Sequence, residues 1–283
     1  MMNGKKMVQQ IIGGVLYNIR AVDLTVLPAI SSIASEQASG TEKSEKKCAQ
    51  LLDYLATHDN ARMHYHASDM VLNIHSGASC LSETIARSCV AGNFFLGSKS
   101  DPTKPILLNG AIYIMCGILK FVVALASEAE LGALFLNSKE GRNIRITLQE
   151  MGHPQPSTPI HCENMTATGI ANDTIKKQRS QSMKMRLFWV TYQGIVDIQW
   201  HTGQENIADY TSKHHDTKHH QVVRPCYIQD DNSLRILPRA ANPSALRGCV
   251  GTVSNGYSRT CPLPRIGVSL QHVDKVPRGR ALV

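Results

Sequence analysis

Residues 64–79, HYHASDMVLNIHSGAS, alternate between apolar and other side chains with a period of two. Met70, Leu72 and Ile74 fall on one side of the chain and the residues between them on the other, which predicts a β-strand. The simplest arrangement of this strand and the two strand-like runs after it is an antiparallel meander. Those two runs, each bounded by Gly or Pro, are GNFFLG at 92–97 and PILLNGAIYIMCG at 105–117.

The chain after this meander alternates between helical and strand-like patterns. A helix is predicted to begin near Ser127 and to run to about Lys139, and RNIRITLQEMG at 142–152 continues it as a second set of turns. Together with the meander, the later segments predict an α/β domain with a mixed five-stranded sheet flanked by helices. Those segments are a strand at 159–163, a helix at 164–173, a basic helix at 180–190, a strand at 196–200 and a helix carrying Asp209.

Helices are also predicted before the sheet. In EKKCAQLLDYLATHD, residues 45–59, four apolar residues at i, i+3, i+4 and i+7 make one stripe, and Thr41 is a suitable N-cap. After Lys213 the sequence becomes rich in His, Pro and Arg and loses its periodicity, so a basic, irregular or disordered tail is predicted from about residue 222. The predicted domains are a helical segment at 1–60, the α/β domain at 61–221 and the tail at 222–283.

The composition limits the possible partners. The chain of 283 residues has a formal net charge of +8 and a pI near 9.1, which suits an anionic partner such as nucleic acid. Most of the excess positive charge lies after Val223, where the sequence has nine Lys and Arg residues and three acidic residues. The eight cysteines show no C-x-x-C spacing, and IIGGVLYNI at 11–19 is too short to span a bilayer. We therefore expect reduced thiols in an intracellular protein, in the cytoplasm or the nucleus, with no membrane partner.

Three acidic residues lie where chemistry is possible. Glu130 follows Ser127 in an S-x-x-E capping box, and taken alone the cap is the favoured interpretation. Glu163 ends a strand, where open α/β sheets place ligand groups, and a carboxylate flanking the next helix explains it equally well. Asp209 on its own is a polar position on an exposed helix. Taken in order, the three can converge as a carboxylate cluster for two divalent cations about 4 Å apart.

The order of several motifs resembles the ribonuclease H domain that ends a copia-type (Pseudoviridae-like) retrotransposon polyprotein, preceded by the end of its reverse transcriptase. The segment ASEAELGAL at 126–134 is similar to the family's S-T-T-E-A-E-Y-x-A-L, and ENIADYTSK at 205–213 to its E-x-L-A-D-x-x-T-K. PIHCENMTATGIAND at 159–173 is similar to its P-I-x-x-C-D-N-x-S-A-x-x-I-A. Upstream, VLYNIRAVDLTVLPAISSIAS at 15–35 and AQLLDYLATHDN at 49–60 resemble reverse transcriptase segments. The resemblance covers about residues 10–215 and implies a ribonuclease H-like fold.

The resemblance also implies an activity: hydrolysis of RNA in RNA/DNA hybrids, with two Mg²⁺ ions, or Mn²⁺, held by Asp, Glu, Asp and Asp. Matched motif by motif, Glu130 takes the second position, Glu163 the third and Asp209 the fourth, while His201 assists proton transfer or product release. The implied partners are the hybrid and the reverse transcriptase portion of the parent polyprotein. The basic segment that contacts the hybrid backbone matches Lys176, Lys177, Arg179, Lys184 and Arg186.

Two of the four acidic positions depart from the family pattern. Gly77 stands where the family has its first Asp, and glycine offers no side-chain oxygen to a hard cation. Glu163 replaces the third Asp, and its extra methylene moves the carboxylate by about 1.5 Å. We therefore expect strongly impaired catalysis. The alternatives are a non-catalytic nucleic-acid-binding module and a translated transposon remnant without a role.

Overall fold

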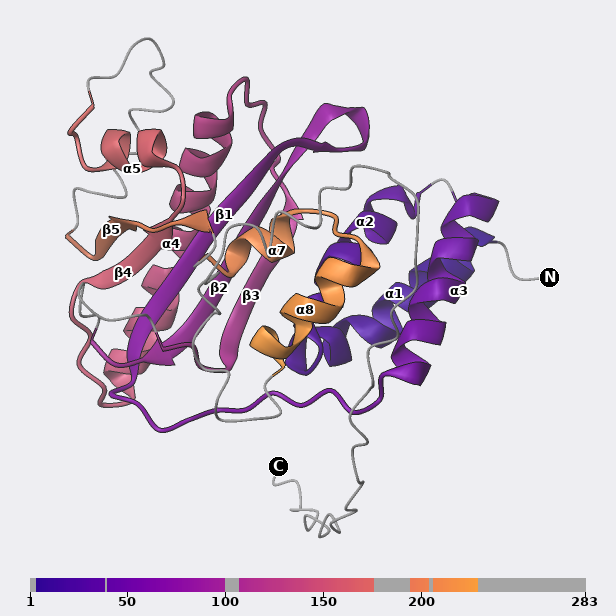
Figure 1. Cartoon of the computed structure of the whole chain (residues 1–283), viewed down its shortest axis with the longest axis horizontal. Coiled ribbons are helices and arrows are strands. Elements are labelled where there is room, and N and C mark those ends of the chain that lie inside the picture. The colour runs from indigo at the N-terminus through magenta and orange to yellow at the C-terminus, as the bar shows by residue number, and fades with distance from the viewer. Residues whose placement is uncertain (1–3, 39, 100–106, 176–193, 204–205, 229–283) are drawn as a thin grey trace, which may run out of the picture. The chain divides into compact units, whose positions relative to one another are not determined.

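The computed structural model describes residues 4–38, 40–99, 107–175, 194–203 and 206–228. Its sheet has the strand order β3-β2-β1-β4-β5 (Figure 1). The first three strands form an antiparallel meander, and β4 and β5 run parallel to β1. The predicted mixed five-stranded sheet flanked by helices is confirmed. The strands are β1 (Val71–Glu83), β2 (Arg87–Gly97), β3 (Ala111–Ile118), β4 (Thr158–Cys162) and β5 (Val196–Trp200).

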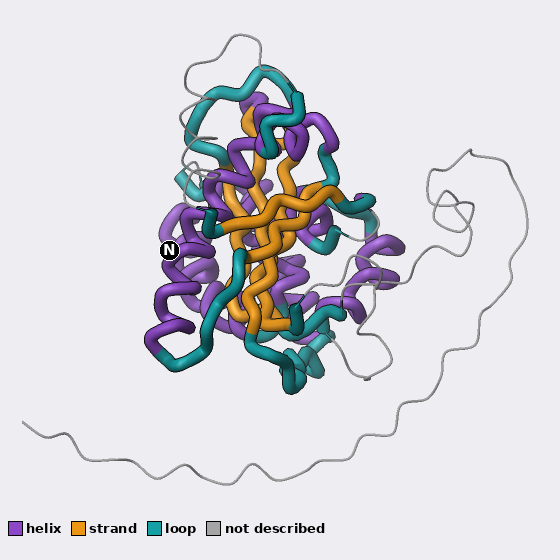
Figure 2. The backbone as a smooth tube through the Cα atoms, turned by 90° about the vertical axis from the view of Figure 1, so that its left-hand side faces the viewer, coloured by secondary structure: helices purple, strands orange, loops and turns teal. Residues whose placement is uncertain are grey.

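The two faces of β1 pack against different helices. Leu72 and Ile74 are fully buried in the cluster that includes the apolar side of α4 (Ala126–Glu150). His75 and Gly77 point the other way, toward the start of α7 (Ala208–Ser212). Figure 2 accordingly shows helices on both sides of the strands. The period of two predicts this strand correctly, although it begins at Val71 and not at residue 64.

Helix α4 is one continuous helix, where the sequence suggests two successive sets of turns. The apparent break falls at Gly141, which lies inside the helix and against β1. A Cβ atom on Gly141 would come within 2.6 Å of Ile74 Cδ1, so the missing side chain lets helix and strand approach closely. The cost of an interior helical glycine is only about 1 kcal/mol relative to alanine, and packing on the sheet offsets it.

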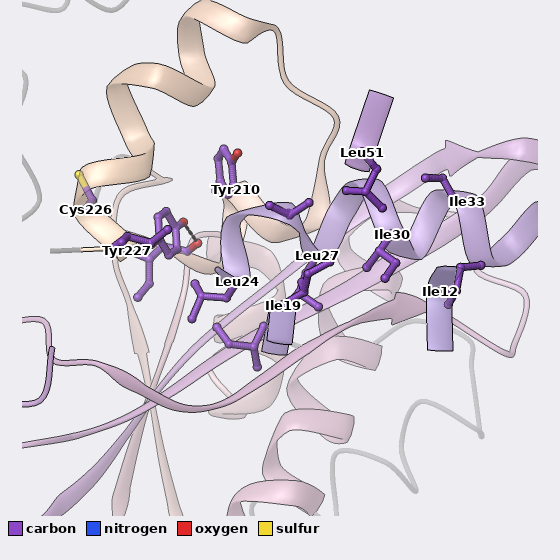
Figure 3. Packing of buried hydrophobic residues seen from close by; sticks show 14 of the residues in the cluster. Ile12, Ile19, Leu24, Leu27, Ile30, Ile33, Leu51, Tyr210, Cys226 and Tyr227 are labelled. Atoms are coloured by element: carbon purple, nitrogen blue, oxygen red, sulfur yellow. Dashed lines mark hydrogen bonds between the residues drawn. The ribbon is translucent and has the colours of Figure 1, made fainter. Parts of the chain in front are cut away.

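The helices that precede the sheet pack against it. Thr41 is the N-cap of α3, as predicted, and its hydroxyl accepts a hydrogen bond from the Ser44 amide (3.3 Å). Apolar side chains of these helices join one buried cluster with Phe95 and Ile114 of the sheet, and Figure 3 draws part of this cluster. The predicted helical segment therefore shares its core with the α/β domain. It comprises α1 (Gly4–Ala21), η1 (Leu24–Val26), α2 (Leu27–Glu36) and α3 (Glu42–Thr57).

The predicted tail requires a correction, because residues 222–227 belong to a helix, α8 (Thr217–Tyr227). Arg224 pairs with the buried Asp23 (3.4 Å), and Tyr54 hydrogen-bonds His220 (2.8 Å). Tyr227 is buried and donates to the Ile207 carbonyl, and Figure 3 shows it beside Leu24 and Tyr210. Partners distant in the sequence thus order this helix. Residues 229–283 of the predicted tail lie outside the described residues.

The connections around the sheet add two short helices. Asn164 is the N-cap of α5 (Met165–Ala171), where its side chain accepts from the Ala167 amide (2.9 Å). The 3-10 helix η2 (Thr84–Ala86) lies between β1 and β2. Within the described ranges, no helix has both the length and the apolar character that crossing a membrane requires.

Candidate active site at the ends of the parallel strands

The parallel pairing of β1, β4 and β5 stops at one aligned row, where β4 and β5 end while β1 continues to Glu83. Ser76 of β1 pairs with Cys162 of β4, which pairs with Trp200 of β5. The next residue on each strand is Gly77, Glu163 or His201, so three of the sequence-predicted positions follow the same row. This is the edge at which open α/β sheets form ligand crevices, because the chains diverge beyond the carboxyl ends of the strands.

Glu130 is not the helix cap that its sequence context favours. The N-cap of α4 is Leu125. Near the start of the helix, the Glu128 carboxylate accepts a hydrogen bond from the Ala124 amide (2.7 Å). Glu130 lies two residues further along the helix, is only 4% exposed and accepts from the Ala78 amide of β1 (3.1 Å). The capping-box interpretation is therefore wrong. Glu130 extends from α4 to the backbone of β1, close to the ends of β4 and β5.

Glu163 and Asp209 are brought together by a lysine that sequence reasoning missed. Lys213 Nζ lies 3.9 Å from Glu163 Oε1 and contacts Asp209 Oδ1 directly. Lys213 follows Asp209 by four residues, a spacing that places two side chains on one helix face, so the pair was visible in the sequence. Glu130, Glu163, Asp209 and Lys213 together form what we call the acidic corner.

Burial and mutual repulsion shift the pKa values in the acidic corner. Burial, followed by the charges of Glu163 and Asp209, raises the pKa of Glu130 to about 8, against the opposing Ala78 amide and Lys213. Burial also raises the pKa of Glu163, and Asp209 adds to that shift. Burial lowers the pKa of Lys213, but its hydrogen bond to Asp209 and the nearby carboxylates outweigh burial and raise it. The raised pKa of Glu130 favours its protonated form near neutral pH, and the raised pKa of Lys213 favours its charged form.

A Glu130→Gln variant should have a flatter pH dependence of stability than the unmodified protein. Between pH 4.5, the ordinary pKa of Glu130, and about 8 the native state keeps a proton that the unfolded chain releases. The free energy of unfolding therefore falls as the pH rises through this window, and glutamine removes that contribution. Urea unfolding at pH 5, 6.5 and 8 measures the difference between variant and unmodified protein. Glu150→Gln, at the exposed end of α4, is the control, and equal slopes in all three proteins would contradict the assignment.

His201 lies at this edge within a row of imidazoles. Its amide donates to the Cys162 carbonyl (3.0 Å), and its ring meets that of His161 edge-on, with centroids 4.4 Å apart. The His161 ring in turn meets His75 at 4.8 Å, and the His75 Nδ1 accepts from the Ile207 amide (3.2 Å). Burial, with a smaller effect of His201, lowers the pKa of His75 to about 3, so this imidazole is neutral. Sequence reasoning missed His75 and His161, which occupy paired positions on adjacent strands.

Gly77 has room for the side chain that the family pattern would put there. A Cβ atom on it would lie 3.4–3.5 Å from atoms of Ala208, which is ordinary van der Waals contact. Ala208 directly precedes Asp209, so a carboxylate at position 77 would border the acidic corner. Gly77 itself supplies no side-chain oxygen at this position.

The described residues do not fit a pair of divalent cations as they are arranged. No group of three or more His, Cys, Asp or Glu side chains in the described ranges is placed to hold a metal ion. Glu130 is engaged by the Ala78 amide, and the Lys213 ammonium occupies the space between the other two carboxylates. The predicted hybrid-contacting residues Lys176, Lys177, Arg179, Lys184 and Arg186 lie outside the described residues.

Comparisons with known proteins bring out ribonuclease H domains. No protein-family model matches the sequence, and no curated protein matches it. The chain is similar to the N-terminal ribonuclease H domain of a Mycobacterium tuberculosis protein, at 9% identity and a TM-score of 0.36, over 50% of this chain and 91% of that one. It is similar to LC11 ribonuclease H1 in complex with an RNA/DNA hybrid, at 9% identity and a TM-score of 0.35, over 49% of this chain and 90% of that one. It is also similar to ribonuclease H1 of Halobacterium salinarum (10%, TM-score 0.34, 49% and 90%).

Proposed function

We propose that this chain is a retrotransposon-derived ribonuclease H-like domain that binds RNA/DNA hybrids and is strongly impaired in hydrolysing their RNA strand. The observation that supports this most is the acidic corner: Glu130, Glu163 and Asp209 gather around Lys213 at the carboxyl ends of the parallel strands. The impairment follows from Gly77, which offers no carboxylate beside Asp209. In active enzymes of this kind, two divalent cations clamp the attacking and leaving oxygens.

The proposal gives the remaining groups defined roles. His201, which follows β5, would assist proton transfer or product release, and its ring orientation is set by contact with His161. The helices of residues 4–57 would be the end of a reverse transcriptase, and their shared core with the sheet fits a segment retained with the domain. An intracellular location fits the six cysteines of the described residues, all of which are free thiols.

Hybrid binding is expected to weaken steeply with salt. If the predicted basic segment contacts the hybrid, each phosphate contact contributes about 0.9 to the slope of log affinity against log salt. Replacing Lys176, Lys177 and Arg179 by Gln should reduce that slope by roughly 2 to 3 and weaken binding. Fluorescence anisotropy of a labelled hybrid between 50 and 300 mM KCl measures both quantities. The double variant Lys43→Gln, Lys46→Gln in α3 removes exposed charge elsewhere and should change the slope little.

A flat salt response of the unmodified protein would count against the proposed contact. Incubation of the same hybrid with the unmodified chain and Mg²⁺ should give cleavage close to the background rate. Robust cleavage by the unmodified chain would contradict the proposed impairment. Binding without cleavage by any variant would favour the second candidate function, a non-catalytic nucleic-acid-binding module, which the Lys213 ion pairs also support.

A further inference from the structure

Lys213 is held at the acidic corner by the backbone that carries it. It directly follows α7, where the chain turns extended. The Ser79 hydroxyl of β1 donates to the Ser212 carbonyl (2.6 Å), and the Cys116 thiol of β3 donates to the Thr211 carbonyl (3.2 Å). The sheet thus fixes the last turn of α7 immediately before Lys213. These two hydrogen bonds therefore hold the backbone in a position from which the Lys213 side chain reaches the carboxylates.

The ammonium group of Lys213 occupies the position that suits a cation. It contacts Asp209 directly, lies 3.9 Å from Glu163, and the three side chains are 42%, 27% and 25% exposed. Any divalent cation that used oxygens of both carboxylates would have to displace this ammonium or lie within a few ångströms of it. Repulsion between a charge of +1 and a charge of +2 at about 4 Å is substantial even in a water-like dielectric.

We propose that Lys213 is a built-in counter-cation that determines how weakly the acidic corner binds divalent metal ions. Resting on the proposed function, this inference assigns the lysine of the segment ENIADYTSK a role in setting the metal affinity of the acidic corner. The single positive charge of the lysine offsets part of the negative charge of Glu163 and Asp209 without any metal. Removing the ammonium leaves two facing carboxylates without a counter-charge and opens their oxygens to Mn²⁺ or Mg²⁺.

The test is Mn²⁺ binding, measured from the electron paramagnetic resonance signal of free Mn²⁺. The Lys213→Met variant should bind Mn²⁺ at least about tenfold more tightly than the unmodified protein, because one nearby positive charge is gone. Lys213→Arg keeps the charge and should bind like the unmodified protein. Lys46→Met is the matched control, since Lys46 makes an equivalent i,i+4 ion pair with Glu42 (2.8 Å) on exposed α3. Circular dichroism checks the fold, and Lys213→Gln replaces Lys213→Met should the latter not fold.

Two outcomes would overturn the inference. The first is equal Mn²⁺ affinity of Lys213→Met and the unmodified protein. The second is tighter binding that persists after Glu163→Gln and Asp209→Asn are added to Lys213→Met, because the ion would then lie elsewhere. The measurement uses no nucleic acid, so it is separable from the proposed function. If Lys213→Met binds Mn²⁺ more tightly but no variant binds or cleaves the hybrid, only the proposed function is contradicted. If cleavage is restored but Lys213→Met does not bind Mn²⁺ more tightly, only the inference about Lys213 is contradicted.

Discussion

The double variant Gly77→Asp, Glu163→Asp should cleave the RNA strand of an RNA/DNA hybrid at least about 100-fold faster than the unmodified protein. Aspartate at position 77 restores an oxygen ligand, and its Cβ atom fits at 3.4–3.5 Å from Ala208, next to Asp209. Aspartate at position 163 withdraws the carboxylate by about 1.5 Å. In a two-metal site, errors of about that size cost roughly 100-fold in rate, so both changes act in the same direction.

The control for this experiment is Gly77→Asn, Glu163→Asp, which has nearly the same shape and lacks the carboxylate at position 77. A labelled hybrid is incubated with each protein in Mg²⁺ and in Mn²⁺, and initial rates are compared on a denaturing gel. The asparagine variant should stay near the rate of the unmodified protein. Equal rates for the aspartate and asparagine variants would show that position 77 is not part of the site. Adding Lys213→Met to the aspartate variant should raise the rate further at limiting metal concentration.

Local patterns in the sequence predict the elements but not always the partners of their side chains. The alternation of Leu72 and Ile74 with Asn73 and His75 predicts β1 because successive side chains of a strand point to opposite faces. The S-x-x-E pattern misassigned Glu130 because its partner, the Ala78 amide, is 52 residues away in the sequence and no local pattern records such a contact. The same holds for α8, whose Arg224 pairs with Asp23 across 201 residues.

In the candidate site, too, the sequence predicts which residues take part but not all of their contacts. Its acidic residues come from motifs with fixed order, so the resemblance finds Glu130, Glu163 and Asp209 without the fold. Lys213 lies within the quoted motif ENIADYTSK, but its contact with Glu163 depends on how α7 packs beside the end of β4. The pairing of His75 with His161 likewise depends on the register of two parallel strands, which side-chain patterns alone leave open.

Phe95→Ala should lower the free energy of unfolding by about 3–5 kcal/mol and should unfold the N-terminal helices and the sheet together. Phe95 is fully buried in the cluster that joins β2 to α1, α2 and α3, part of which Figure 3 shows. Its neighbour Phe94 is equally buried on the opposite face, against α4. Two matched variants of β2 are therefore possible. Phe95→Ala removes a side chain from the core shared with the N-terminal helices, and Phe94→Ala removes one from the core between the sheet and α4.

Urea unfolding followed by circular dichroism and by fluorescence of the two tryptophans tests this prediction. If the helices before the sheet belong to its cooperative unit, Phe94→Ala and Phe95→Ala should each shift a single transition, with the two probes coincident. If residues 1–60 form a separate unit, Phe95→Ala should separate the probes or leave a stable sheet, because residues 1–60 contain no tryptophan and Trp200 lies on β5 of the sheet. The shared burial of Phe95 with helix residues favours the single transition, since removing one side of this core exposes the other to water.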